Sequence, residues 1–307
     1  MTVDVLMAVF DGERHLEEQA ASILGQEGAD LVLVARDDAS TDGSADILAR
    51  LARAHPGRVR IEPGGPRLGA AAGFGALLQG SQADYSFFSD QDDVWLPGKV
   101  EATLQAMRDL EERHGVEVPL LVHSDLRVVD ARLQPIAESF WVHHRLDPAH
   151  DARLDRLLVR NVVTGCTVAV NRALRARAGA IPPEAAMHDW WLALVAAAFG
   201  HTGRVGRPTV LYRQHDTNQI GARPAGVGEG VRAAARGRVG RYYRRTRVQA
   251  RGFRDRYRDQ LDPRARAIVE AYAGLEERGP IARRAGLLSH GFREEGLLRN
   301  LALLAFF

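Results

Sequence analysis

Three carboxylates fall within four consecutive residues, Asp90 to Asp93, interrupted only by Gln91. Carboxylates crowded in this way repel one another and raise one another's pKa, and a divalent cation relieves that repulsion. Hard oxygen ligands suit Mg²⁺ or Mn²⁺, so Asp90 and Asp92 are candidate metal ligands that would place a cation beside a diphosphate leaving group. The alternative is a solvated acidic helix start, because acids are favoured near helix N-termini.

Asp37 and Asp38 form a second acidic site. A carboxylate at this place can accept hydrogen bonds from a nucleotide base or from ribose hydroxyls. The alternative is a structural turn or a helix N-cap, a position at which Asp is favoured.

The motif His188-Asp189-Trp190-Trp191 follows two prolines and begins an expected helix. Asp189 is a candidate general base that would deprotonate an acceptor hydroxyl, a role that typically contributes about 10²- to 10⁴-fold to the rate. Trp190 and Trp191 are candidates for stacking on an acceptor sugar. The alternative is Asp189 as a helix cap, with both tryptophans in the core.

Two further segments hold candidate ligands. His215 is a candidate metal ligand, and Arg213, two residues earlier, is a candidate partner for phosphate charge. A lone histidine is more often structural, so that interpretation of His215 stays open. Asp125, which lies between two apolar runs, is a candidate for binding the acceptor.

These groups need elements that bring them together. Apolar runs at residues 3–9, 31–34, 59–61 and 85–88 predict strands, and helical patterns lie between them. This order predicts an α/β fold with a mostly parallel, Rossmann-like sheet and helices on both faces. Asp37 and Asp90 then follow strand ends, where ligands of such sheets bind.

Later segments complete the expected domain. We expect strands at residues 120–122, 126–129, 164–170 and 209–212, with a helix at 189–199. Residues 221–230 hold a proline and four glycines and predict a linker. The remaining residues predict an Arg-rich helical extension over 222–307, separate from a domain over 1–221.

Composition narrows the class of protein. The chain has 307 residues, of which 46% are hydrophobic and 26% charged, as in ordinary globular proteins. No apolar run approaches the roughly 18 residues that a membrane span requires. The N-terminus lacks the pattern of a signal peptide, and the single Cys166 excludes an intrachain disulfide. We therefore expect a cytoplasmic location.

The blocks of polar residues, taken in order, resemble the family 2 glycosyltransferases, which have the GT-A fold. The blocks in the first half are VDVLMA (3–8), RDDASTDG (36–43) and SDQDDVWLP (89–97). The blocks NVVTGC (161–166), HDWW (188–191) and YRQH (212–215), with Asn218, resemble the bacterial rhamnosyltransferase-like branch. The resemblance covers roughly residues 2–221; residues 8–11 depart from the usual small or hydroxyl residues and Asn of the first turn.

This resemblance implies an inverting, metal-dependent transfer of a sugar from a UDP- or dTDP-sugar. Asp38, with Asp37 nearby, would bind base and ribose. Asp90 and Asp92 would hold Mn²⁺ or Mg²⁺ and the diphosphate, and Asp189 would be the base. The nucleotide-sugar half would cover about residues 1–118 and the acceptor half about 119–221.

The rhamnosyltransferase-like branch implies a donor, an acceptor and one further ligand. The donor would be dTDP-rhamnose. The acceptor would be a growing cell-surface polysaccharide or a lipid-linked glycan. His215 would be a further contact for the metal or the diphosphate.

Two other functions stay open. A sugar nucleotidyltransferase also uses a parallel sheet and Mg²⁺ held by carboxylates, but it usually needs a Gly-rich basic loop, which residues 10–14 do not offer convincingly. A non-catalytic module that binds sugar or nucleic acid would make the carboxylates incidental.

The C-terminal region differs in charge from the rest. The net charge of +2 combines +10 after residue 222, from 19 Arg against 9 acids, with −8 before it. An anionic membrane surface is a better partner for this region than nucleic acid, because the body already predicts a sugar site. Residues 297–307 would lie in the membrane interface, or these helices would pack on the catalytic domain or another subunit.

Overall fold

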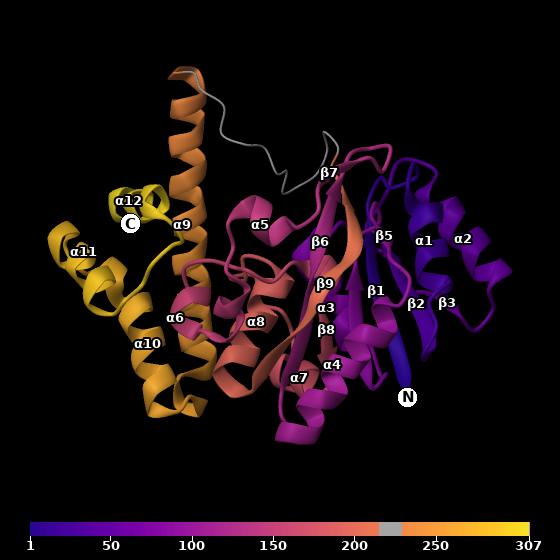
Figure 1. The fold of residues 1–307 in the computed structure, drawn as a ribbon, viewed down its shortest axis with the longest axis horizontal. Coiled ribbons are helices and arrows are strands. Elements are labelled where there is room, and N and C mark those ends of the chain that lie inside the picture. Colours follow the sequence, from indigo (N-terminus) through magenta and orange to yellow (C-terminus); the bar gives the residue numbers. More distant parts are fainter. Residues whose placement is uncertain (215–228, 307) are drawn as a thin grey trace.

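The computed structural model describes residues 1–214 and 229–306, and Figure 1 shows them as a central sheet with helices on both sides. The strands are β1 (Thr2–Val9), β2 (Asp30–Asp37), β3 (Val59–Ile61), β4 (Tyr85–Ser89), β5 (Val94–Trp95), β6 (Leu120–Val129), β7 (Pro135–Ala137), β8 (Ala169–Asn171) and β9 (His201–Arg213). The helices up to residue 200 are α1 (Leu16–Leu24), α2 (Ser44–Ala54), α3 (Ala70–Gly80), α4 (Lys99–His114), α5 (Phe140–His144), α6 (Leu154–Leu157), α7 (Arg172–Ala178) and α8 (His188–Phe199). The C-terminal helices are α9 (Glu229–Tyr257), α10 (Pro263–Ala273), α11 (Pro280–Ser289) and α12 (Leu297–Phe306).

The sheet has the order β3-β2-β1-β4-β8-β6-β9-β5, with β7 paired to β6. Its N-terminal strands β3, β2, β1 and β4 are all parallel, which confirms the expected Rossmann-like half. Strand β8 lies antiparallel to both β4 and β6, and β9 runs parallel to β6. The sheet therefore changes character between β4 and β8, where the second half of the domain begins.

Two apolar cores lie on the two faces of the sheet. Neighbouring residues of β1 divide between them, because successive side chains of a strand point to opposite faces: Leu6 joins one core, and Val5 and Met7 join the other. Helices α1, α2 and α4 cover one face, and α3, α6 and α8 cover the other. The predicted helices on both faces are confirmed.

One predicted strand is wrong in its first half. Residues 164–170 were expected to be extended, but Gly165–Thr167 form a 3₁₀ turn and only Ala169–Asn171 join the sheet. The Thr167 hydroxyl and backbone N–H both donate to the Thr164 carbonyl. Local bonds of this kind compete with strand pairing, and the apolar pattern does not reveal them.

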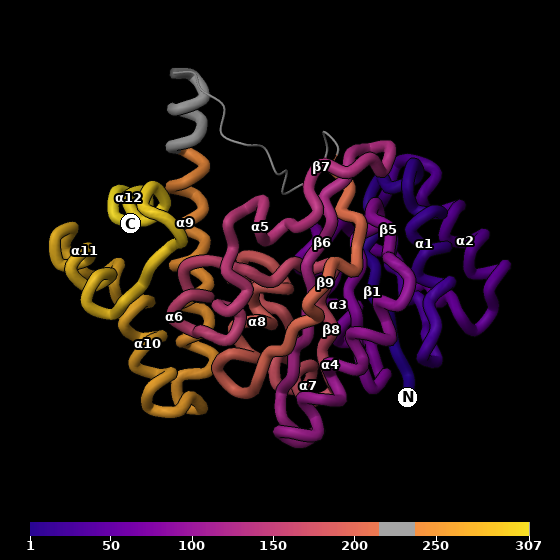
Figure 2. The backbone as a smooth tube through the Cα atoms, in the orientation of Figure 1, coloured from indigo at the N-terminus to yellow at the C-terminus, as the bar shows by residue number. Residues whose placement is uncertain are grey.

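The helical C-terminal region packs on the domain. Phe253, Tyr257 and Tyr272 are buried in the same core as Trp191 of α8, and Figure 2 shows the chain of α9 and α10 running beside the domain. The predicted boundary at residue 221 and most of the predicted linker lie outside the described residues. Among the described helices, none is both long and apolar enough to cross a membrane.

Candidate active site

The predicted acids meet at one edge of the parallel half. In the sheet register, Val9 of β1 lies opposite Asp37 of β2, and Met7 lies opposite Ser89 of β4. The carboxyl ends of these three strands are therefore adjacent, and the turns after β2 and β4 carry Asp38 and Asp90 to the same edge.

A side-chain amide ties the acidic turn to the end of β1. The Phe10 backbone N–H donates to Gln91 Oε1 at 2.7 Å, and Gln91 Nε2 donates to the Phe10 carbonyl at 2.9 Å. A Cβ at Gly12 would lie 2.6 Å from Gln91 Cδ, so a side chain there would displace the Gln91 amide from this tie. The sequence pattern predicted no role for Gln91, although its position inside the acidic motif was the available signal.

Buried and half-buried carboxylates crowd this edge. Ligand atoms of Asp90, Asp93 and Cys166 all lie within 4.8 Å of one another. Burial, together with the charges of Asp92 and Asp189, raises the pKa of Asp90 to about 7. Burial and the charges of Asp92 and Asp90 raise the pKa of Asp93 well above its usual range. Such mutual repulsion, at oxygens suited to hard ions, fits a divalent cation.

A buried lysine lies behind these acids, and the sequence analysis had not assigned it a role. Lys99 Nζ lies 3.3 Å from Thr209 Oγ1 and 4.7 Å from the centre of the Trp95 ring. Burial lowers the pKa of Lys99 to about 8, and the charges of Cys166 and Asp93 oppose that shift. Lys99 is the only lysine in a chain otherwise supplied with arginine, and this was the signal for it.

Asp189 joins the site from the other half of the domain. It lies in the first turn of α8, and its charge contributes to the raised pKa of Asp90. Burial raises the pKa of Asp189 to about 7, opposed by hydrogen bonds from the backbone of Trp190 and Gly165 and from the Asn161 side chain. A carboxyl with that pKa is matched to general base catalysis near neutral pH.

The acids after β2 have structural partners. Asp38 pairs with Arg36 and accepts the backbone N–H groups of Leu68 and Gly69 at 2.8 and 2.7 Å. Burial acts to raise the pKa of Asp38, but these bonds outweigh it and hold the pKa below its usual value. Asp38 thus orders the loop before α3. Asp37 is half-buried and accepts from the backbone N–H and the hydroxyl of Ser40.

Arg213 has a structural task in place of the predicted phosphate contact. Its guanidinium is almost fully buried and donates to the carbonyls of Asp92 and Ala131 and to the carboxylate of Glu18. Its backbone N–H donates to Asp93. Arg213 therefore joins the end of β9 to the acidic turn.

Asp125 also differs from its predicted role. Its carboxylate is buried and accepts the Ser139 hydroxyl and the backbone N–H groups of Leu126 and Trp141. These bonds hold the start of α5 against β6 and bind Asp125 to the protein rather than to an acceptor.

The stacking role predicted for the tryptophans is wrong. Trp191 is fully buried, with its ring 5.4 Å from that of Phe253 and 6.0 Å from that of Tyr257. Trp190 is also buried, and its indole N–H donates to the Leu157 carbonyl at 2.6 Å. Rings packed in the core cannot lie on a sugar face. His215, the remaining predicted ligand, lies outside the described residues.

A parallel Rossmann-like half with acids at its carboxyl edge, joined to a mixed half that adds a buried carboxyl, is the architecture of GT-A glycosyltransferases. The sequence profile described as Glycosyl transferase family 2 matches residues 4–175. The chain is 26% identical to the dTDP-rhamnosyl transferase RfbG of Shigella flexneri, over 70% of this chain and 74% of that protein. It is 29% identical to the putative glycosyltransferase EpsE of Bacillus subtilis, over 43% of this chain and 48% of that protein.

Solved structures share the fold. The mannosyltransferase PcManGT of Pyrobaculum calidifontis, in complex with GDP-Man and Mn²⁺, superposes with a TM-score of 0.55 at 21% identity, covering 99% of this chain and 78% of that one. S. aureus TarS 1–349 in complex with UDP-GlcNAc gives a TM-score of 0.54 at 12% identity, over 94% and 89% of the two chains. The protein belongs to glycosyltransferase family 2 and is a glycosyltransferase with a GT-A fold.

The Gln91 tie can be tested by unfolding. Gln91→Ala leaves the N–H and C=O of Phe10 without these partners, so we expect the free energy of unfolding to fall by at least about 1 kcal/mol. Gln105→Ala, on the exposed face of α4, is the control and should stay within about 0.5 kcal/mol of the parent. Equal urea midpoints for the two variants would contradict a stabilising tie.

Proposed function

We propose that this glycosyltransferase transfers rhamnose, with inversion, from dTDP-rhamnose or a related UDP-sugar to a hydroxyl of a cell-surface polysaccharide or a lipid-linked glycan. The observation that carries the proposal is the buried carboxyl of Asp189, with a pKa of about 7, close enough to Asp90 to raise its pKa. The choice of rhamnose is supported by the similarity to a dTDP-rhamnosyl transferase. A nucleotidyltransferase or a non-catalytic module has no comparable support.

In this mechanism Asp189 takes the proton of the acceptor hydroxyl. The oxygen attacks the anomeric carbon of the donor sugar as the bond from that carbon to the diphosphate oxygen breaks. The nucleoside diphosphate leaves with the electron pair of that bond. One displacement from the face opposite the leaving group inverts the anomeric centre.

Asp90 and Asp92 are the residues proposed to hold Mn²⁺ or Mg²⁺, with His215 as a third ligand. A bound cation would supply positive charge against the departing diphosphate. Asp93 would support these ligands from its buried position, where Arg213 N–H already holds one of its oxygens. Asp38 would contribute to nucleotide binding indirectly, by ordering the loop before α3. Half-buried Asp37 would accept a hydrogen bond from a ribose hydroxyl.

A cation test addresses the acidic turn. With Mn²⁺ and dTDP each near 100 times its dissociation constant, each ligand should stabilise the parent by about 2.7 kcal/mol and raise its Tm. Asp92→Asn should lose the part of this rise that depends on Mn²⁺. Asp109→Asn, at an exposed acid of α4, is the control and should keep the full rise. A Mn²⁺-dependent rise in Asp92→Asn equal to that of the parent would remove Asp92 from the ligand set.

The base is tested by turnover and pH. Asp189→Asn should lower release of dTDP from dTDP-rhamnose by about 10²- to 10⁴-fold and leave dTDP binding intact. Because the base acts in its ionised form, turnover of the parent should fall tenfold per pH unit below about 7 and level off above it. Asp46→Asn, at an exposed acid of α2, should match the parent. A flat profile between pH 5 and 8 would refute this assignment.

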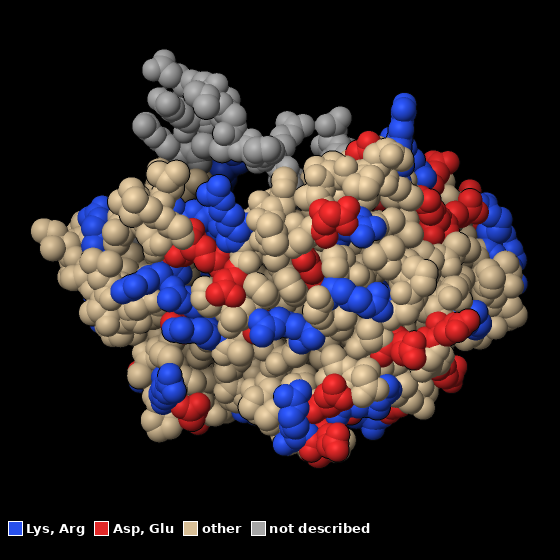
Figure 3. Space-filling view, viewed as in Figure 1, with Lys and Arg blue, Asp and Glu red and all other residues tan. Residues whose placement is uncertain are grey.

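The proposal extends to a membrane contact through α11 and α12. Ile281 is 86% exposed and Leu288 56%, seven residues apart on α11. Leu297, Leu298 and Leu301 of α12 are 76, 82 and 52% exposed. The spacing places each set on one helix face. Figure 3 shows basic side chains beside uncharged residues over the C-terminal helices. Apolar stripes with nearby arginine suit the interface of an anionic bilayer.

Vesicle binding tests this contact. The triple variant with Leu297, Leu298 and Leu301 changed to Ser should bind vesicles of phosphatidylglycerol and phosphatidylcholine at least about tenfold more weakly, since burial of one leucine contributes roughly 1.5–3 kcal/mol. Val142→Ser removes a side chain that is 78% exposed on α5 and serves as the control. Equal binding by parent and triple variant, or equal binding of the parent to pure phosphatidylcholine, would contradict the proposal.

A further inference from the structure

Helix α9 holds the backbone of Ala186, three residues ahead of Asp189, at both of its polar groups. The Ala186 N–H donates to Gln249 Oε1 at 2.8 Å, and the Arg245 guanidinium donates to the Ala186 carbonyl at 2.6 Å. Gln249 is only 1% exposed, so its bond is shielded from water. Residues about 60 positions later in the chain thus fix the entry to the helix that carries the proposed base.

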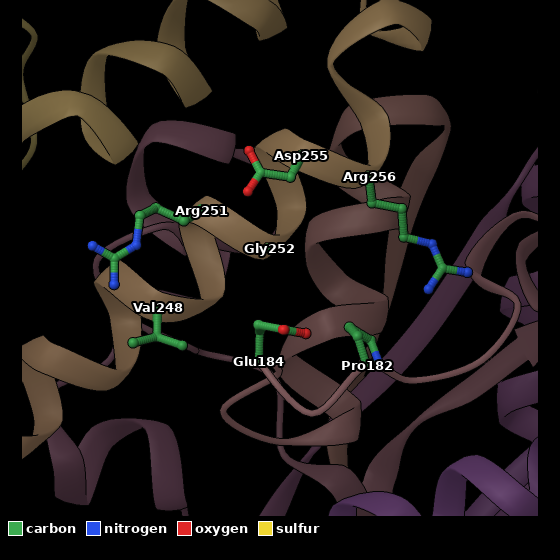
Figure 4. Close-up of a pocket in the computed structure, with 7 residues that line it drawn as sticks. All are labelled: Pro182, Glu184, Val248, Arg251, Gly252, Asp255 and Arg256. Atoms are coloured by element: carbon green, nitrogen blue, oxygen red, sulfur yellow. The ribbon is translucent and has the colours of Figure 1, made fainter.

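Helix α9 also contacts the segment between α7 and Ala186. Arg256 donates to the carbonyls of Ala178 and Ala180 at the end of α7. A Cβ at Gly252 would lie 2.7 Å from Glu184 Cβ, so the loop passes directly against α9. Figure 4 shows this contact, where Glu184 and Pro182 face Arg251, Gly252, Asp255 and Arg256 across a cavity of about 470 Å³.

Helix α8 depends on contacts from outside its own first turn. Its N-cap residue, Met187, makes no side-chain capping bond. Besides the bonds that this turn makes to Leu157, Gly165 and Asn161, two sets of contacts orient it: the bonds to Ala186 and the packing of Trp191 on Phe253. Both sets of contacts come from α9.

We propose that Gln249 and Arg245 are positioning residues for catalysis, which act by holding Ala186 so that Asp189 stands within reach of the acceptor hydroxyl. This inference rests on the proposed role of Asp189 as the base. A displacement of about 1 Å at a reacting group can lower a rate about 10²-fold. The donor site lies at the ends of β1, β2 and β4, so loss of the α9 contacts should reduce turnover and spare donor binding.

The first test compares three variants of α9 in the full chain. Gln249→Leu removes the acceptor for Ala186 N–H, and Arg245→Met removes the donor to its carbonyl. Arg247→Met, whose guanidinium pairs with Glu276 inside the C-terminal region, is the matched control. We expect Gln249→Leu and Arg245→Met to release dTDP from dTDP-rhamnose at least tenfold more slowly, with unchanged affinity for dTDP and Mn²⁺. Arg247→Met should keep the turnover of the parent.

A steric pair gives a second test that does not remove a polar group. Gly252→Ala adds a Cβ that collides with Glu184 Cβ and pushes the loop away from α9. Turnover should fall as in Gln249→Leu. Glu184→Gly removes the colliding atom, so the double variant should regain most of the lost turnover. Equal Tm values for the parent and Gly252→Ala would separate displacement of the loop from general destabilisation, which keeps the inference testable if Gln249→Leu does not fold.

Amide exchange separates this inference from the proposed function. Hydrogen–deuterium exchange of a peptide covering Ala186 should become faster in Gln249→Leu and stay unchanged in Arg247→Met, whatever the donor sugar is. If Asp189→Asn keeps full turnover, the assignment of Asp189 as the base fails. The exchange result would still show whether α9 holds the backbone of Ala186. If Asp189→Asn is inactive but Gln249→Leu and Gly252→Ala match the parent, or lose dTDP binding together with turnover, the positioning role is refuted.

Discussion

Repulsion among buried carboxylates at one sheet edge is the constraint on which the site depends. Asp90, Asp93 and Asp189 come from two halves of the domain, and burial raises the pKa of each. Taking charged carboxylates out of water costs free energy unless donors or cations compensate. The protein supplies part of this compensation through the Arg213 N–H on Asp93 and through Lys99 behind the cluster.

The compensation is incomplete, and that has a functional consequence. Carboxyls whose pKa is about 7 are partly protonated at neutral pH, so a cation that binds Asp90 must displace protons. Hydrogen bonds to backbone groups hold the geometry: the Gln91 amide joins the acidic turn to β1, and the Arg213 guanidinium joins it to β9. The turn is therefore held in place from both β1 and β9.

Much of this arrangement could be predicted from the sequence, because strand order and the position of an acid after a strand are local patterns. The placement of Asp37 and Asp90 at the carboxyl ends of parallel strands, on either side of β1, agrees with them. Burial is not local: Trp191 and Arg213 have side-chain types that suit a sugar or a phosphate, and only the three-dimensional packing shows that both are enclosed. Asp38 illustrates the same limit, since its partners Leu68 and Gly69 lie 30 residues away.

The C-terminal region forms both a charged surface and a part of the hydrophobic core, but its sequence indicates only the charged surface. Its arginines predict a charged surface, and Arg241 and Arg244 are indeed exposed. Further along the same helix, Phe253 and Tyr257 complete the core around Trp191, and each buried side chain of this kind contributes roughly 1.5–3 kcal/mol. Helix α8 cannot keep that face buried without α9. Because the proposed base lies in the first turn of α8, the interface that stabilises the core is also the one that we propose positions Asp189.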